Sequence, residues 1–319
     1  MKILVTGCAG FIGFHTVEKF LEKKLKVVGI DNLNNYYDVK LKKDRLKLLK
    51  KNKKDFLFIK NDIKNINFLK KIVKKNKIST IVHLAAQAGV RDSITNPKKY
   101  FDNNVIVFFN VLEVCRKFKI KLIYASSSSV YGEEKPMKEE TETKPIQFYA
   151  ATKKTNETMA EVFSKLYHFN SIGLRFFTVY GPYGRPDMSY YQFSKMLLNN
   201  KKINIHNKFN HSRDFTYISD VTNFIYKCYL DIKKNKKIRN SIYNVGNGKK
   251  ISLKSLVFLL EKNFKKKFKV NLVDKQTGDI KDTLADITKA KKDLEFKPKI
   301  SFIQGIKKFT TWFNLYHKK

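Results

Sequence analysis

Short apolar runs alternate with segments of helical spacing through the first half of the chain. The strand-like runs are Lys2–Thr6, Lys26–Ile30, Phe56–Ile59, Thr80–His83 and Lys121–Ala125. Between them, apolar residues recur every three or four positions, over residues 11–24 and at about 39–51, 65–76 and 99–118. Strands that alternate with crossover helices predict an α/β fold with a doubly wound parallel sheet and right-handed connections.

The alternation breaks in the second half. A helix beginning near Tyr149 and a strand at Ser171–Arg175 continue the pattern, but Gly181–Met188 (GPYGRPDM) is typical of a loop. The later pattern predicts helices at about 190–199, 219–231, 252–264 and 301–316, a strand pair near 203–216 and a strand at Ile242–Val245. We therefore expect one large domain over 1–176, rejoined by part of 214–248. A smaller lobe would be built from 177–213 and 249–319.

The charge of the chain is strongly positive, with 66 Lys and Arg against 28 Asp and Glu, for a net charge of +38. Nucleic-acid binding is one interpretation of such a balance. However, the lysines are spread from Lys2 to Lys319, and no basic block is interleaved with base-stacking aromatic residues. We favour solvated lysines, predict no nucleic-acid partner, and expect the positive field to favour an anionic substrate.

The N-terminus, the apolar runs and the cysteines indicate where the protein is located and which sites it lacks. MKILVTG enters a strand-like run without the apolar core of a signal peptide, and no apolar run reaches the roughly 18–20 residues that span a bilayer. We predict a cytoplasmic protein without membrane insertion. The cysteines, Cys8, Cys115 and Cys228, are scattered and form no CxxC pair, which argues against a disulfide framework or a zinc site. We expect them to be buried free thiols, and we predict no metal.

A glycine-rich turn joins the first strand to the first helix. Thr6–Gly13 (TGCAGFIG) places Gly7, Gly10 and Gly13 where a backbone can approach a diphosphate at a helix N-terminus. Asp31 ends the second strand, where an acid can accept hydrogen bonds from ribose hydroxyls and would repel a 2′-phosphate. This favours NAD over NADP. Asp62, at the end of the third strand, is a weaker candidate for contact with adenine.

A tyrosine and a lysine stand four positions apart in YAATK, which places Tyr149 and Lys153 on one face of a helix. An ammonium beside a phenol favours the phenolate form. The pKa of a free phenol is about 10, so it must fall by about three units for the side chain to act as a base near pH 7. Lys153 and the cationic nicotinamide would supply this shift jointly. The serine run Ser126–Ser129 follows the fifth strand, so one of its hydroxyls is expected beside Tyr149.

These motifs, in this order, resemble the extended short-chain dehydrogenase/reductases over nearly the whole chain. The stretches TGCAGFIG, HLAAQAGVR, SSSSVYG, YAATK, LRFFTVYGP, RDFTYISD and GD…TLAD all match. Within that family, DNLNNYYD and RFFTVYGPYGRPDM are most similar to nucleotide-sugar 4-epimerases that act on UDP-glucuronate. The resemblance implies a Rossmann-type NAD-binding domain, a smaller C-terminal substrate-binding lobe and a homodimer formed by the helices near 99–118 and 149–167.

The resemblance also implies a role for individual residues. The catalytic residues would be Tyr149 as base, Lys153 and Ser127. NAD would be bound by Gly7, Gly10, Phe11, Ile12, Gly13, Asp31, Asn32, Asp62, Ile63, Ala85, Ala86, Gln87, Tyr149 and Lys153. The UDP-sugar would be bound by Arg91, Ser127, Ser128, Tyr149, Thr178, Arg185, Arg213 and Asp279.

The implied reaction is 4-epimerisation of a UDP-sugar by reversible oxidation at C4 through a 4-keto intermediate. The resemblance favours conversion of UDP-glucuronate to UDP-galacturonate. Relatives that eliminate water or decarboxylate carry acids just before VYG, where this chain has Ser128 and Ser129. We hypothesise that Ser127, Ser128 and Arg185 hold the uronate carboxylate, although Ser128 and Ser129 also suit a turn that bonds local backbone.

The alternatives are 4-epimerisation of UDP-glucose or UDP-N-acetylglucosamine, decarboxylation of UDP-glucuronate, and an NAD-binding protein without activity. Two departures from the family pattern bear on the assignment. Asp92 and Ser93 follow Arg91 where an aromatic residue is frequent, which leaves the role of Arg91 open. Ser219 stands where an acid is common, a change that we expect to affect only the cap of the following helix.

Overall fold

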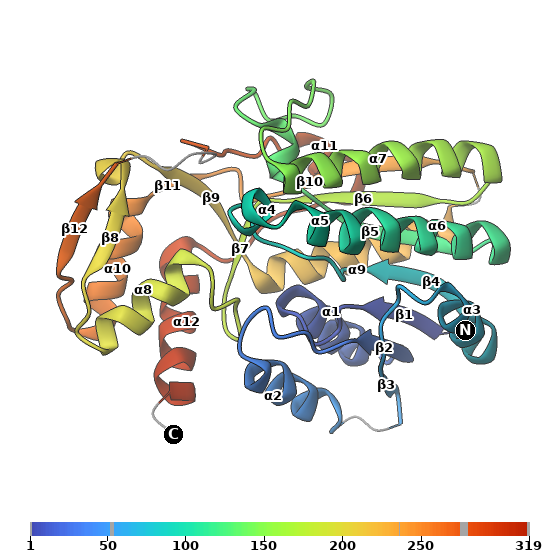
Figure 1. Cartoon of the computed structure of the whole chain (residues 1–319), viewed down its shortest axis with the longest axis horizontal. Helices are drawn as coiled ribbons and strands as arrows, with labels where there is room; N and C mark the ends of the chain where they lie inside the picture. Colours follow the sequence, from blue (N-terminus) through green and yellow to red (C-terminus); the bar gives the residue numbers. More distant parts are fainter. Residues whose placement is uncertain (1, 52–53, 236, 275–279, 318–319) are drawn as a thin grey trace.

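A seven-stranded parallel sheet forms the larger part of the molecule, in a computed structural model that describes residues 2–51, 54–235, 237–274 and 280–317 (Figure 1). In sheet order the strands are β10 (Asn240–Val245), β6 (Ser171–Phe176), β5 (Lys121–Ser127), β4 (Ile78–His83), β1 (Lys2–Thr6), β2 (Val27–Asp31) and β3 (Phe56–Lys60). The chain reverses its direction of progress across the sheet between β1 and β4. The predicted doubly wound α/β sheet is confirmed, and β10 is its edge strand beside β6.

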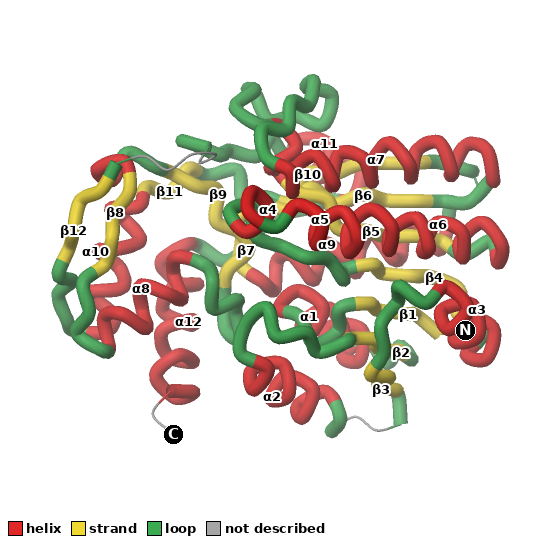
Figure 2. Tube along the Cα trace, in the orientation of Figure 1, coloured by secondary structure: helices red, strands yellow, loops and turns green. Residues whose placement is uncertain are grey.

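Helices cover both faces of this sheet, as Figure 2 shows. One face carries α1 (Phe11–Glu22), α2 (Val39–Leu49) and α9 (Ile218–Lys234); the other carries α3 (Ile66–Asn76), α6 (Val107–Phe118) and α7 (Phe148–Tyr167). Alternation along β1 explains the two cores, because Ile3 and Val5 enter one while Leu4 enters the other. The predicted apolar runs in β1, β2, β4 and β5 are therefore strands largely buried on both faces, whereas the edge strand β3 leaves Leu57 exposed.

The first of these cores continues into a smaller lobe. Its elements are β7 (Thr178–Tyr180), α8 (Ser189–Leu198), β8 (Ile203–His206), η3 (Asn207–Phe209), β9 (Ser212–Tyr217), β11 (Lys250–Ser252), α10 (Leu253–Phe264), β12 (Val270–Val273) and α12 (Phe302–His317). The short helix α11 (Thr288–Leu294) packs instead against β10 and α9. Strands β11, β9 and β7 form one small sheet, and β12 pairs with β8 in another. The domain boundaries expected from the sequence remain a prediction.

Three local expectations need correction. The strands near 203–216 do not pair with each other, because β8 bonds to β12 and β9 bonds to β7 and β11. The helix expected over 99–118 is three pieces, α5 (Pro97–Tyr100), the π-helix η1 (Phe101–Ile106) and α6, preceded by the short α4 (Asp92–Thr95). Ser219 lies inside α9, whose N-cap is Tyr217, so it does not occupy the cap.

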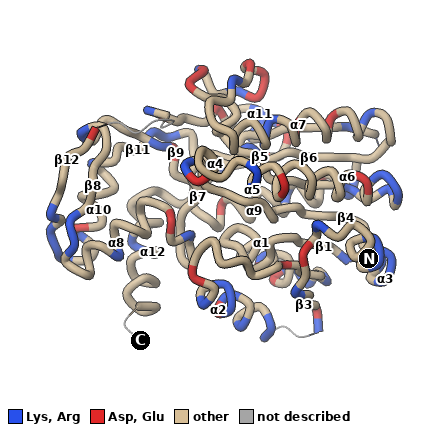
Figure 3. The backbone as a smooth tube through the Cα atoms, viewed as in Figure 1, with Lys and Arg blue, Asp and Glu red and all other residues tan. Residues whose placement is uncertain are grey.

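The surface carries the excess positive charge without one dominant cluster. Figure 3 shows Lys and Arg along many helices and loops of both lobes. Cys8, Cys115 and Cys228 are buried free thiols, as predicted. Within the described part of the chain, we find no helix with the length and apolar character needed to cross a bilayer.

A buried ion pair joins α7 to the sheet. Glu157 on α7 accepts two hydrogen bonds from Arg175 on β6, both 2.9 Å long, and the two side chains are only 2% and 3% exposed. The hydroxyl of Ser126 donates to Glu157 as well, and Arg175 donates to the phenolic oxygen of Tyr131 at 2.8 Å. Tyr131 in turn donates to Asn244 on β10. One network therefore fixes α7 against β5, β6 and β10.

We expect Glu157→Gln to destabilise the protein by about 3–5 kcal/mol, because it leaves the Arg175 cation buried without its counter-charge. Urea denaturation would measure the loss. Glu161→Gln is the matched control on the same helix, since Glu161 pairs with Lys165 at the surface, and we expect a change within about 0.5 kcal/mol. Equal stability of Glu157→Gln and the wild type would contradict this account.

Candidate active site

A cavity of about 930 Å³ lies at the carboxyl ends of the parallel strands, against the smaller lobe. This is the position that ligands occupy in doubly wound sheets. It brings together every described residue predicted for the site: Gly7, Gly10, Phe11, Ile12, Gly13, Asp31, Asn32, Asp62, Ile63, Ala85, Ala86, Gln87, Arg91, Ser127, Ser128, Tyr149, Lys153, Thr178, Arg185 and Arg213. Asp279 lies outside the described residues.

The glycine-rich loop is packed too closely for side chains at two of its glycines. Gly7 has a φ of +70°, and a Cβ there would lie 2.8 Å from the backbone nitrogen of Ala85. A Cβ on Gly13 would lie 2.0 Å from the carbonyl oxygen of Gly7. Gly10 is the N-cap of α1, and no side-chain cap occupies that helix end. The first N–H groups of α1 therefore face the cavity as an anion-binding terminus.

The acids at the ends of β2 and β3 border the same end of the cavity. Asp31 accepts from the backbone nitrogen of Ala9 at 3.0 Å and from that of Leu33 at 2.8 Å, one bond on each carboxylate oxygen. Each oxygen keeps capacity for a further donor. Asn32 donates to Asp62 at 3.1 Å, which holds these two side chains side by side.

The N-terminal turn of α7 is fixed by neighbours that sequence reasoning missed. The backbone nitrogen of Tyr149 donates to the buried hydroxyl of Ser93 at 3.1 Å, and Ser93 donates to the carbonyl of Val90 at 2.6 Å. Asn104, on the π-helix η1, bonds both backbone groups of Gln87 and also donates to Thr152. The turn that presents Tyr149 is thus tied to the strand end that carries Ala85–Gln87.

The side chains of Tyr149, Ser127 and Lys153 lie together at the carboxyl end of β5. The phenol of Tyr149 hydrogen-bonds Ser127. The amine of Lys153 lies 5.9 Å from the centre of the Tyr149 ring and donates to the carbonyl of Ala125 at 2.9 Å. The oxygen of Ser127 also accepts from the backbone nitrogen of Ser129 at 3.2 Å, so this serine caps the 3-10 turn η2 (Ser128–Tyr131) as well as facing the phenol.

Burial dominates the electrostatics of this trio. It raises the pKa of the Tyr149 phenol, while the Ser127 hydrogen bond and the charge of Arg185 act in the opposite direction. Burial lowers the pKa of Lys153 to about 8, and the nearby charge of Glu157 limits that fall. The charge of Arg185 therefore acts on the phenol, and the Lys153 amine lies over the same ring.

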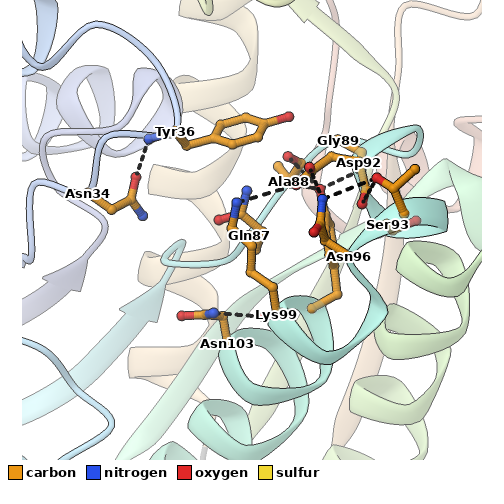
Figure 4. Close-up of polar contacts among 12 residues, drawn as sticks. Asn34, Tyr36, Gln87, Ala88, Gly89, Asp92, Ser93, Asn96, Lys99 and Asn103 are labelled. Carbon is orange, nitrogen blue, oxygen red and sulfur yellow. Dashed lines mark hydrogen bonds and ion pairs between the residues drawn. The ribbon is translucent and has the colours of Figure 1, made fainter.

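Arg185 and Asp187 form an ion pair at the opposite wall of the cavity. The Nε of Arg185 donates to Asp187 at 3.0 Å, and its Nη2 donates to the second carboxylate oxygen. Tyr36 approaches from the loop after β2, and Figure 4 shows its ring extending from the Asn34 turn toward Gly89. The space is tight, because a Cβ on Gly89 would lie 2.1 Å from the Tyr36 hydroxyl.

Other residues that line the cavity were not among the site residues predicted from the sequence. Tyr36, Lys42 and Gln147 line it, and Lys42 donates to both oxygens of Asn34. Glu157 follows Lys153 by four positions, so both lie on one helical face, but this spacing does not identify Arg175 as the partner of Glu157. Among the described residues, no group of three or more His, Cys, Asp and Glu side chains is arranged to hold a metal ion.

Comparison with known proteins places the whole chain in one group. Residues 4–309 match the family model described as GDP-mannose 4,6 dehydratase. The UDP-glucuronate 4-epimerase of Thermodesulfobacterium geofontis is 42% identical over 313 residues, covering 97% of this chain and 95% of that protein.

Solved structures of two epimerases also match nearly the full length. The UDP-glucuronic acid 4-epimerase of Bacillus cereus, solved with UDP-glucuronic acid and NAD, superposes with a TM-score of 0.93 at 35% identity over 99% of this chain and 100% of that one. The UDP-glucose 4-epimerase of Thermotoga maritima with UDP-glucose gives a TM-score of 0.88 at 28% identity over 99% of both chains.

We expect Lys153 to titrate near pH 8, because burial of the amine disfavours its charged form. Carbon-13 NMR of lysine-labelled protein would follow the titration, with Lys153→Met identifying the signal. In Glu157→Gln, the midpoint should move to lower pH, because a negative charge that favours the ammonium is lost. A wild-type midpoint near the ordinary lysine value, about 10.4, would refute the expectation.

Proposed function

The chain belongs to the GDP-mannose 4,6 dehydratase family of extended short-chain dehydrogenase/reductases, and on that premise we propose that it interconverts UDP-glucuronate and UDP-galacturonate by NAD-dependent epimerisation at C4. The observation that carries the proposal is the hydrogen-bonded pair of Tyr149 and Ser127, in a cavity that also contains a glycine-rich helix terminus and the Arg185 guanidinium. A protein that only bound NAD would not need this proton-transfer pair.

The residues along the cavity suit a bound NAD. The uncapped terminus of α1 offers N–H donors to a diphosphate, and Asp31 retains acceptor capacity for two ribose hydroxyls. Asn32, Asp62 and Ile63 would border the adenine, while Ala85–Gln87, Tyr149 and Lys153 would border the nicotinamide half. When bound, NAD would accept the C4 hydride, return it to the opposite face, and add a positive charge near the phenol.

The chain's own part of the reaction is proton transfer and orientation. Tyr149 would take the proton of the C4 hydroxyl and give it back to the epimeric oxygen, with Ser127 bonding that same oxygen. Because burial raises the pKa of the Tyr149 phenol, its use as a base requires positive charge close by. Arg185 supplies part of that charge, and protonated Lys153 steadies the mouth of β5 through Ala125.

The assignment of a uronate rests on what surrounds the expected position of C6. Arg185 lines the cavity with Ser127, Ser128 and Thr178, a set of donors that suits a carboxylate. Arg213 and Asp279 would serve the UDP half, as the resemblance implies. At positions 128 and 129, serines replace the acids that related dehydratases and decarboxylases carry, so elimination or decarboxylation lacks its proton-transfer group.

We expect purified protein to convert UDP-glucuronate to its C4 epimer faster than it converts UDP-glucose or UDP-N-acetylglucosamine. Proton NMR separates the epimers and also detects a decarboxylated product. Tyr149→Phe should lower the rate about 10²- to 10⁴-fold, because the phenolic oxygen moves the proton, while UDP-glucuronate still binds. Turnover of UDP-glucose with none of UDP-glucuronate would overturn the substrate assignment. An unimpaired Tyr149→Phe would overturn the mechanism.

A homodimer is a second part of the proposal. Helices α6 and α7 lie side by side on one face of the sheet, where the rings of Phe109 and Phe163 pack 5.9 Å apart (Figure 1). Helices α6 and α7, with η1 just before α6, carry exposed apolar side chains: Phe101 and Ile106 on η1, Phe109 on α6, and Val162 and Leu166 on α7. Two such pairs of helices related by a twofold axis would cover these side chains. A cytoplasmic location, expected from the sequence, remains a prediction.

We expect Phe109→Glu to shift the protein from dimer to monomer, because it places a charge at the centre of the proposed interface. Light scattering after size-exclusion chromatography gives the mass. Phe258→Glu is the matched control, since Phe258 is 60% exposed on α10, away from these helices, and it should leave the mass of the assembly as in the wild type. A monomeric wild type, or a dimeric Phe109→Glu, would refute the interface.

A further inference from the structure

Arg45 is a fully buried cation whose hydrogen-bond acceptors are all neutral oxygens. It lies on α2 and is 0% exposed. Its Nη1 donates to the carbonyl of Ala9 at 2.8 Å and to the Tyr37 hydroxyl at 2.7 Å. Its Nη2 donates to the carbonyls of Tyr183 at 2.6 Å and Gly184 at 3.1 Å. Burying a guanidinium without a counter-charge is costly, so its presence here calls for an explanation beyond packing.

The acceptors belong to two segments with different tasks. Ala9 lies in the glycine-rich loop, and its own N–H donates to Asp31. Tyr183 and Gly184 directly precede Arg185 in the loop that closes the other side of the cavity. A single guanidinium thus joins the expected dinucleotide loop to the segment that places Arg185.

A second side chain from the large domain, His15, contacts the loop that precedes Arg185. The imidazole of His15, on α1, lies 3.0 Å from the carbonyl of Pro182. Residues 182–184 are therefore held through three successive carbonyl groups by Arg45 and His15. The position of Arg185 depends on this backbone, since its side chain begins at the next residue.

We propose that Arg45 is a positioning residue that couples the dinucleotide loop to the Arg185 segment, so that binding of NAD and binding of an anionic UDP-sugar strengthen each other. The inference rests on the proposed function, because it takes a dinucleotide at α1 and a uronate at Arg185. A diphosphate at α1 would supply the negative charge that the buried Arg45 lacks and would favour the arrangement that Arg45 holds. Coupling of this kind is reciprocal and typically amounts to about 5- to 150-fold in affinity.

The shape of the guanidinium matters as much as its charge. Arg45 uses two separate nitrogens, one for each segment, and a lysine has only one nitrogen with which to reach both. Arg45→Lys should keep the charge and lose the bridge, whereas Arg45→Met should lose both. The loop itself should persist in either variant, because the Tyr183 ring also packs against Phe14 and Trp312 at 5.3 Å and 4.9 Å.

Equilibrium dialysis of NAD, with and without saturating UDP-glucuronate, tests the proposal. In the wild type we expect UDP-glucuronate to tighten NAD binding about 5- to 150-fold. Arg45→Lys should bind NAD alone nearly as well but show no tightening, and Arg45→Met should bind NAD more weakly and also show none. Tyr37→Phe is the matched control: it removes only the Arg45 contact that reaches neither segment, and it should keep the tightening.

The outcomes separate the two proposals. If the wild type does not epimerise UDP-glucuronate, the proposed function fails whatever Arg45 does. If the wild type is active but Arg45→Lys keeps the full tightening, the role of Arg45 is refuted. Should circular dichroism show that neither Arg45 variant folds, His15→Leu decides, because releasing Pro182 must also weaken the tightening. An unchanged His15→Leu would then reject the coupling.

Discussion

The buried ion pair of Glu157 and Arg175 is the interaction on which the arrangement of the site depends. It fixes α7 against β5 and β6, and α7 carries both Tyr149 and Lys153. Its charge also limits the fall in the pKa of Lys153, so that the amine stays largely protonated at neutral pH. A buried charge pair contributes little net stability in general, because desolvation offsets the attraction. Its value here is geometric, since the pair leaves one orientation for the helix that presents the phenol.

The cavity needs the small lobe as well as the sheet. The large domain contributes the glycine-rich loop, Asp31, Tyr149 and Lys153 to the cavity. The segments that cover the cavity follow β6 in the chain and contribute Thr178, Arg185 and Arg213. The loop of residues 182–184 contacts the large domain through its carbonyl oxygens, which accept from His15 and Arg45. Every residue type carries such an oxygen. The sequence of the loop therefore shows little of its function, and the side chains that hold it, His15 and Arg45, lie more than 130 positions away.

This distance marks the limit of inference from the sequence. Parallel strands, their helices and the glycine-rich turn follow from local periodicity, and their boundaries agree to within a few residues. The pairing of β8 with β12, the π-helix η1 and the role of Ser93 depend on contacts between segments far apart in the chain, and no local pattern encodes them. Resemblance to a family predicted which residues line the cavity. It did not predict that the charge of Arg185 acts on the Tyr149 phenol.

The serine run YASSSSVYG shows how one short segment serves structure and chemistry together. Ser126 points into the protein and bonds Glu157, so it belongs to the network that holds α7. Ser127, the next residue of the strand, points into the cavity and bonds Tyr149, as the alternation of side chains along β5 requires. The same alternation prevents the two serines from exchanging roles.

Because burial raises the pKa of Tyr149, the phenol stays protonated until enough positive charge gathers beside it. In the proposed mechanism, the phenol would therefore act as a base only once NAD brings that positive charge to the site.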